Sequence, residues 1–137
     1  MPPLNTPQQA QQKEIQEPNY DNAIVKEIER KFGQYVFAER KGDISHLRFE
    51  EKETTHDNGA KYVGEWNMQT GLREGRGTQV WMDGSKYEGS WVAGKANGKG
   101  RLIHADGDVY EGDWVDDKAQ GYGVYTHMDG AQYRGYW

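Results

Sequence analysis

The chain has 137 residues, 28% of them charged and 34% hydrophobic, so we expect one domain with little buried interior. Its net charge of -5 is spread over both halves, neither of which is basic, and this argues against nucleic acid as a partner. The absence of cysteine excludes disulfide bonds and thiolate chemistry, and no apolar run approaches the ~20 residues of a membrane span. We therefore expect a cytoplasmic protein whose contact with a membrane is at most peripheral.

The N-terminal part is predicted to hold a flexible segment followed by a short helix. Residues 1–18 are rich in proline and glutamine and offer almost nothing to bury, which is typical of flexible chain. Residues 21–32 place Ile24, Ile28 and Phe32 on one stripe, as an amphipathic helix does.

The ends of this helix and the chain after it carry further signals. Asp21 or Asn22 is the expected N-cap, and Gly33 is the expected stop. Alternating apolar residues then predict short strands at 34–38 and at 47–53.

The rest of the chain contains four copies of one phrase, Tyr-X-Gly-X-Trp, whose tyrosines are spaced by 25, 23 and 23 residues. A Gly-X-Gly step follows each of the first three copies, and these units close with Asp-Gly, a dipeptide that accepts the positive φ of tight turns. Each unit is therefore predicted to be one β-hairpin. The predicted units are 57–84, 85–107, 108–130 and a partial one at 131–137.

This combination resembles the MORN (membrane occupation and recognition nexus) repeat family, whose unit has the same aromatic phrase, glycine step and terminal Asp-Gly. The resemblance covers Asp57 to Trp137 and implies a mainly β fold, a single-layer elongated antiparallel β-meander of stacked hairpins behind a short helix and capping strands. The departures are two extra residues between Trp66 and Gly75, and Asp117 in place of a turn glycine. Both fall in turns, where extra length costs little.

A meander of hairpins has two open edges, and open strand edges attract unwanted pairing unless they are covered. We interpret residues 19–56 as a cap for one edge, with a helix reserved for a partner as the alternative. At the other edge, the chain stops at Trp137 before the return strand of its last unit. We expect that the sequence belongs to a longer protein that supplies the return strand. The alternatives are that this edge pairs with a neighbouring chain or a second copy, or that the last strand frays.

Strand alternation assigns the side chains of the phrase to faces. Tyr87, Gly89 and Trp91 share one face, as do Gly98 and Gly100 on the return strand. We expect the rings to cover these bare glycines as an aromatic ladder along the sheet. The side chains that we propose for partner binding are Trp66, Trp91, Trp114, Tyr133, Tyr136 and Trp137.

Basic residues are concentrated in and after the first two hairpin turns, at Arg73, Arg76, Lys95, Lys99 and Arg101. Stacking is expected to bring them to one side of the sheet, where each would add about 1 kcal/mol to the binding of acidic lipid. A solvated polar face is the simpler interpretation, and lipid binding is kept as the alternative.

No arrangement in the sequence predicts catalysis, a cofactor or a metal. His104 and His127 hold equivalent positions two strands apart, about 9 to 10 Å, whereas a shared zinc needs each nitrogen at about 2 Å. The turn carboxylates and glycine steps lack the partners that acid–base catalysis or a phosphate loop requires. We therefore predict that the protein is not an enzyme.

The resemblance implies a scaffold that binds other proteins in a eukaryotic cytoskeletal or ciliary assembly, such as an axonemal radial spoke. It also leaves open a module that binds phosphoinositides, and a regulatory region of a larger enzyme such as a phosphatidylinositol phosphate kinase. The expected location, in the cytoplasm at the cytoskeleton or in a cilium, rests on the same resemblance.

Overall fold

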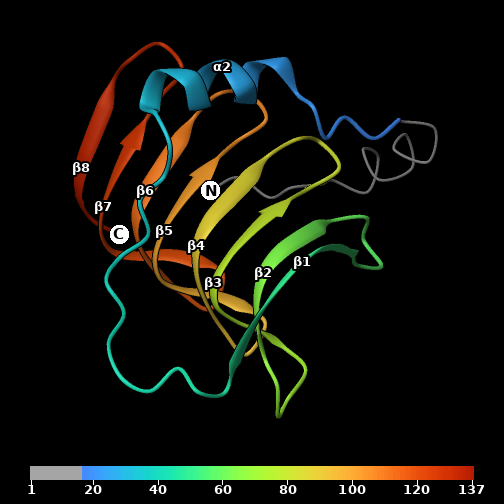
Figure 1. Cartoon of the computed structure of the whole chain (residues 1–137). Coiled ribbons are helices and arrows are strands. Elements are labelled where there is room, and N and C mark those ends of the chain that lie inside the picture. The colour runs from blue at the N-terminus through green and yellow to red at the C-terminus, as the bar shows by residue number, and fades with distance from the viewer. Residues whose placement is uncertain (1–16) are drawn as a thin grey trace.

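The computed structural model describes residues 17–137, which form one antiparallel sheet of eight strands and one helix (Figure 1). Each strand is hydrogen-bonded to the next in chain order, so the sheet is a meander without crossovers. This confirms the predicted single-layer, mainly β fold, whereas the segment predicted to be flexible lies outside the described residues except for its last two. The elements are α2 (Ala23–Phe32), β1 (Leu47–Thr55), β2 (Lys61–Asn67), β3 (Arg73–Val80), β4 (Lys86–Val92), β5 (Lys95–Ile103), β6 (Val109–Val115), β7 (Lys118–Thr126) and β8 (Gln132–Tyr136).

The Asp-Gly dipeptides form the predicted turns. Gly84, Gly107 and Gly130 have φ between 89° and 99°, a region that glycine enters without steric cost. At the opposite ends of the hairpins, Gly94 has φ 81° and Asp117, which replaces it one unit later, has φ 70°. Aspartate tolerates this left-handed region better than most residues, which explains why the substitution leaves the turn intact.

The aromatic ladder predicted on one face of the sheet is confirmed. The ring of Tyr87 meets Trp91 of its own unit at 5.1 Å and Trp114 of the next unit at 5.2 Å, both edge to face. The same contacts continue from Tyr62 to Trp137. Such pairs contribute about 0.5 to 1.5 kcal/mol each beyond the area that they bury. The ladder is therefore the main core of the protein.

Hydrogen bonds fix the polar ends of the ladder rings. The hydroxyl of Tyr87 donates to the carbonyl of Ser90 at 2.9 Å, and the indole of Trp114 donates to the carbonyl of Gly100 at 3.0 Å. Equivalent bonds recur in the neighbouring units. Because each indole bonds the backbone of the preceding hairpin, one repeat is held in place by the one before it.

The two glycines of each Gly-X-Gly step have different roles, which corrects the expectation that rings cover both. A Cβ on Gly100 would lie 2.3 Å from the hydroxyl oxygen of Tyr87. A Cβ on Gly98 would meet Ser90 instead, and Gly98 has φ 89°. The pairing of β4 with β5 is interrupted between Gly89 and Trp91, and this bulge ends the strict alternation assumed from the sequence.

Helix α2 packs on one face of the sheet (Figure 1). Its buried residues contact a cluster separate from the ladder, on the opposite face. The Asn22 side chain is its N-cap and accepts hydrogen bonds from two backbone N–H groups of the first turn, at 2.8 and 3.2 Å. Val25 and Ile28 are buried against Ile103 and Val109 of β5 and β6. The predicted helix is thus confirmed. The helix covers a face of the sheet, and the strand that extends the sheet at its N-terminal edge is β1.

The predicted apolar stripe of the helix was only partly right. Ile24 and Phe32 are 42% and 40% exposed, whereas Val25, which was not predicted, is 3% exposed. The reason is that Val25 and Ile28 already fill the small apolar patch that the sheet offers, because most side chains on this face are polar.

The chain between α2 and β1 runs across the same face as an extended strap, residues 34–46, and the strand predicted at 34–38 is wrong. A strand forms by backbone hydrogen bonds to the open edge of another strand. The strap lies over a face of the sheet, and the backbone N–H and C=O groups of the strands beneath it point sideways to neighbouring strands, so they are not available to it. The other strand prediction, 47–53, is confirmed by β1.

Side chains of the sheet hold the strap in place. Arg76 donates to the carbonyl of Ala38 at 2.7 Å, and its guanidinium lies 5.7 Å from the ring centroid of Phe37. One unit further along, Arg101 stands in the same relation to Tyr35, at 5.5 Å. Two arginines of the repeats are therefore committed to contacts within the chain.

The buried tyrosines make the stability of the fold sensitive to alkaline pH. Burial raises the pKa of Tyr62, Tyr87 and Tyr110 above the ordinary value of 10.0, because the phenolate would lose its hydration. A raised folded-state pKa contributes stability that is present below the unfolded pKa and is lost as the pH rises above it. We expect the free energy of unfolding in urea to be constant at about pH 8 to 9 and to fall steeply above about pH 10.

The Tyr62→Phe variant is the control for this prediction, since phenylalanine cannot ionise. At about pH 8 it should be less stable by about 1 to 3 kcal/mol, because the Glu65 carbonyl loses the hydrogen bond that it accepts at 2.7 Å. Above about pH 10 its deficit should shrink. A deficit that stays constant across this range would show that Tyr62 ionisation does not limit alkaline stability.

Candidate functional site

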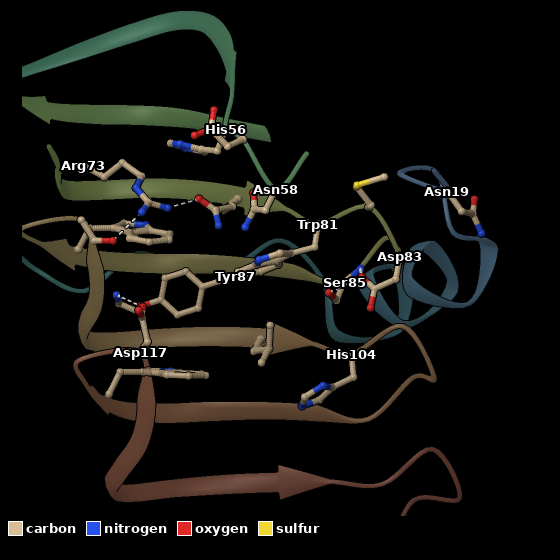
Figure 2. A pocket seen from close by; sticks show the side chains of 18 of the residues that line it. Asn19, His56, Asn58, Arg73, Trp81, Asp83, Ser85, Tyr87, His104 and Asp117 are labelled. Carbon is tan, nitrogen blue, oxygen red and sulfur yellow. Dashed lines mark hydrogen bonds between the residues drawn. The ribbon is translucent and has the colours of Figure 1, made fainter. Parts of the chain in front are cut away.

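The ladder face carries a groove of about 1140 Å³ (Figure 2). Its floor is built by the side chains of β4, β5 and β6, namely Tyr87, Trp91, Leu102 and Trp114, which are between 1% and 7% exposed. These rings are held edge to face and by their hydrogen bonds, so the floor is apolar and rigid. The face of the sheet that stabilises the fold is thus also the face that offers a binding surface.

Arg73 forms one wall of the groove. Its guanidinium lies 4.7 Å from the ring centroid of Trp91, donates to the carbonyl of Gly94 at 2.7 Å and bonds the side-chain oxygen of Gln79 (Figure 2). In the register of β2 and β3, Arg73 is the partner of Trp66. The corresponding partners of Trp91 and Trp114 in the later units are alanines, so only the first hairpin places a long side chain at this position. Burial lowers the pKa of Arg73, but a guanidinium stays charged.

A row of rings lies where the strands leave the groove toward the Asp-Gly turns. The row holds His56, Trp81, His104 and His127, each two residues before an Asn-Gly or Asp-Gly turn. Burial lowers the pKa of His56 and of His104, so both are neutral at pH 7, and neither buried Nε2 has a hydrogen-bond partner within residues 17–137. Sequence reasoning found only the last two, although counting back from each turn finds all four.

Carboxylates stand along the rim of the groove, at Glu17, Asp57, Asp83 and Asp117. Asp83 and Asp117 each use one oxygen to accept a backbone N–H, at 2.9 Å from Ser85 and 2.7 Å from Ala96, which leaves the other oxygen free within residues 17–137. None of the four forms an ion pair with a described lysine or arginine. The rim is therefore negatively charged. Among the described residues, no group of three His, Cys, Asp or Glu side chains is placed to hold a metal.

The structure separates the six side chains proposed for partner binding into three places. Trp91 and Trp114 lie in the groove floor, and Trp66 is partly buried at the start of the ladder, outside the groove lining. The remaining three lie on or next to β8 and are well exposed: Tyr133 by 58%, Tyr136 by 86% and Trp137 by 48%. Within the described chain, β8 is the outermost strand beside β7.

The expectation that the five basic residues of the lipid-binding alternative share one side of the sheet is only partly right, because Arg76, Lys99 and Arg101 lie on one face and Arg73 lies on the other. Arg73 lies on the ladder face, whereas Arg76 and Arg101 lie on the opposite face beneath the strap. Lys99 pairs with a carboxylate of β6, and Lys95 is exposed at the start of β5. Arg73 and Arg76 of β3 differ because odd and even positions of a strand face opposite sides.

No helix within residues 17–137 is long and apolar enough to cross a membrane. A search among curated proteins found no match to the chain. The family model of the MORN repeat, by contrast, matches three consecutive stretches, residues 62–86, 87–109 and 110–132, which make up just over half of the chain. Each matched stretch opens at a ladder tyrosine and contains the glycine that a ring covers and the Asp-Gly turn that closes the hairpin. Sequence match and ring-on-glycine stacking agree, and the chain belongs to the MORN repeat family, whose repeats are generally non-catalytic and commonly bind proteins or lipids.

Proposed function

We propose that this chain is a non-enzymatic scaffold that binds a partner protein along the ladder-face groove, within a eukaryotic cytoskeletal or ciliary assembly. The groove is the observation that carries the proposal. It has a rigid aromatic floor and a polar rim, the composition that protein-binding surfaces share. The choice of assembly follows the members of the family that serve the cell cortex and the heads of radial spokes.

The lipid-binding alternative has weaker support in the arrangement of charges. Three of its five residues, Arg73, Arg76 and Arg101, donate hydrogen bonds within the chain, and Lys99 is ion-paired. Lys95 forms no ion pair with a described residue, and one lysine contributes only about 1 kcal/mol near an acidic membrane. Protein binding is therefore the function that the site supports best.

Site-specific photocrosslinking in the native cell tests this proposal. Met82 lies on the groove rim, and Met128 holds the equivalent position two units later, outside the groove lining. Both are exposed, by 39% and 55%, so a photoreactive residue is tolerated at either one. We expect crosslinks from position 82 to proteins of a cytoskeletal or axonemal assembly, identified by mass spectrometry, and none to these proteins from position 128.

Two outcomes would contradict the proposal. Equal capture of the same proteins at both positions would show that the groove is not the contact surface. Flotation of the purified protein with phosphatidylserine vesicles, lost when Lys95 and Lys99 are changed to alanine, would instead support the lipid-binding alternative.

A further inference from the structure

We infer that the occupant of the groove is an extended, positively charged segment of the partner, with apolar side chains that alternate with lysine or arginine. This inference rests on the proposed function and names the partner chemistry of the same site. It is carried by the difference in charge pairing between the two faces of the sheet.

On the face opposite the ladder, three carboxylates have cationic partners within the chain. Glu65 pairs with Arg40 of the strap at 2.6 Å, and Glu88 pairs with Arg101 at 3.4 Å. Further along the same face, Asp113 is paired with a lysine of β5. The charges of these three carboxylates are thus neutralised by the fold itself.

The rim of the groove is different, because Glu17, Asp57, Asp83 and Asp117 form no ion pair with a lysine or arginine within residues 17–137. Asp117 is attracted by the guanidinium of Arg73, and the other three carboxylates lack even this. Like charges around one concave surface repel each other and focus the negative potential into it. A partner that brings lysine or arginine would relieve this repulsion, and one that brings carboxylates would increase it.

The cationic groups of the groove do not offset the negative charge of the rim carboxylates. Arg73 is the one lysine or arginine among the described residues that line the groove, and its donors are turned to Gln79 and to the carbonyl of Gly94. The groove histidines, His56 and His104, are kept neutral at pH 7 because burial lowers the pKa of each. The four carboxylates therefore outweigh one inward-facing guanidinium.

The shape of the groove sets the length and pattern of the segment. The lining runs from the turn before β2, at His56 and Asp57, to Trp114 on β6. Four strand spacings of about 4.8 Å give about 19 Å, the length of about six residues of extended chain. In an extended segment, alternate side chains point down to the aromatic floor and the others point away from it, so that only side chains as long as lysine or arginine bend back to the rim. Asp57 and Asp83 lie at one end of the strands and Asp117 at the other.

Two labelled hexapeptides test this inference on the full chain. One alternates arginine and leucine and the other alternates glutamate and leucine, and binding is followed by fluorescence anisotropy at low and high salt. We expect the arginine peptide to bind, with an affinity that falls as salt rises, and the glutamate peptide not to bind.

A matched pair of variants then locates the binding. The groove variant carries Asp57→Asn, Asp83→Asn and Asp117→Asn, which keep the oxygens that accept the backbone hydrogen bonds. The control variant removes the same charge outside the groove lining, by Glu51→Gln, Asp116→Asn and Asp129→Asn. We expect the groove variant to bind the arginine peptide about tenfold more weakly and the control variant to change by less than about twofold.

Several results would overturn the inference: equal binding of the glutamate peptide, equal weakening in both variants, or no weakening in the groove variant. Circular dichroism melts of both variants check that each is folded. Failure here is distinguishable from failure of the proposed function. If position 82 still captures its partner equally well in the groove variant, the cationic chemistry is wrong and the groove remains the binding surface.

Discussion

Changing Gly100 to alanine should leave the repeat array largely unfolded. The added Cβ would lie 2.3 Å from the hydroxyl oxygen of Tyr87 and 2.5 Å from its ring carbons. That ring cannot move aside, because Trp91 and Trp114 hold it edge to face at 5.1 and 5.2 Å. Overpacking a rigid core in this way costs about 3 kcal/mol or more, a large part of the stability of a small domain.

Gly130→Ala is the matched control for this substitution. A Cβ on Gly130 would meet nothing within 4 Å, but its φ of 97° imposes strain on any residue with a side chain. That strain costs about 1 to 2 kcal/mol. Urea unfolding followed by tryptophan fluorescence compares the two variants. If Gly100→Ala is no more destabilising than Gly130→Ala, the glycine is needed for its backbone and not for the ring above it.

Tyr87→Ala is expected to have the second large effect, a loss of about 3 to 5 kcal/mol in the free energy of unfolding. Tyr87 is 1% exposed and touches a tryptophan of its own unit and one of the next. Its removal leaves a cavity in the middle of the ladder and breaks the contact that joins two repeats. Because each repeat is held by its neighbours, we expect the whole array to unfold in one transition at lower temperature.

Tyr133→Ala tests whether the loss of stability expected for Tyr87→Ala comes from the Tyr-X-Gly-X-Trp sequence itself or from the side chains packed around the tyrosine. Tyr133 occupies the same place in the last copy of Tyr-X-Gly-X-Trp, but it is 58% exposed. Its removal should cost less than about 1 kcal/mol, as an exposed substitution usually does. Thermal unfolding by circular dichroism gives both values under one condition. Equal losses in the two variants would contradict the account of a ladder stabilised by stacking against neighbouring units.

Much of the fold was predictable because its signals are local and repeated. An Asp-Gly dipeptide predicts its own turn, and a tyrosine four residues before a tryptophan marks one side of a strand, so the hairpins and the ladder followed from short-range patterns. The order of the hairpins in one meander followed from the resemblance to the MORN repeat family. The N-cap of α2 was also readable, since Asn22 bonds N–H groups only two and three residues away.

The predictions that were wrong depended on contacts between distant parts of the chain. Residues 34–38 alternate like a strand, yet they lie on a sheet face, where Arg76 bonds the carbonyl of Ala38 and Arg101 lies over the ring of Tyr35, more than thirty-five residues away in sequence. Val25 replaced Ile24 in the helix interface because the sheet supplied an apolar patch of limited size. Arg73 was grouped with the other basic residues, although it lies on the ladder face and Arg76 and Arg101 lie on the opposite one.

The amino-acid pattern was sufficient for the MORN repeats, the single-layer meander and the ladder, because the same short-range rules act in every unit and reinforce one another. The groove and its unpaired rim were not visible in the pattern. They depend on which hairpin carries Arg73, on where the turns place Asp57, Asp83 and Asp117, and on which carboxylates find partners on the other face. Charge pairing is settled by distances in space, and those distances exist only once the hairpins have stacked and the strap has crossed the sheet.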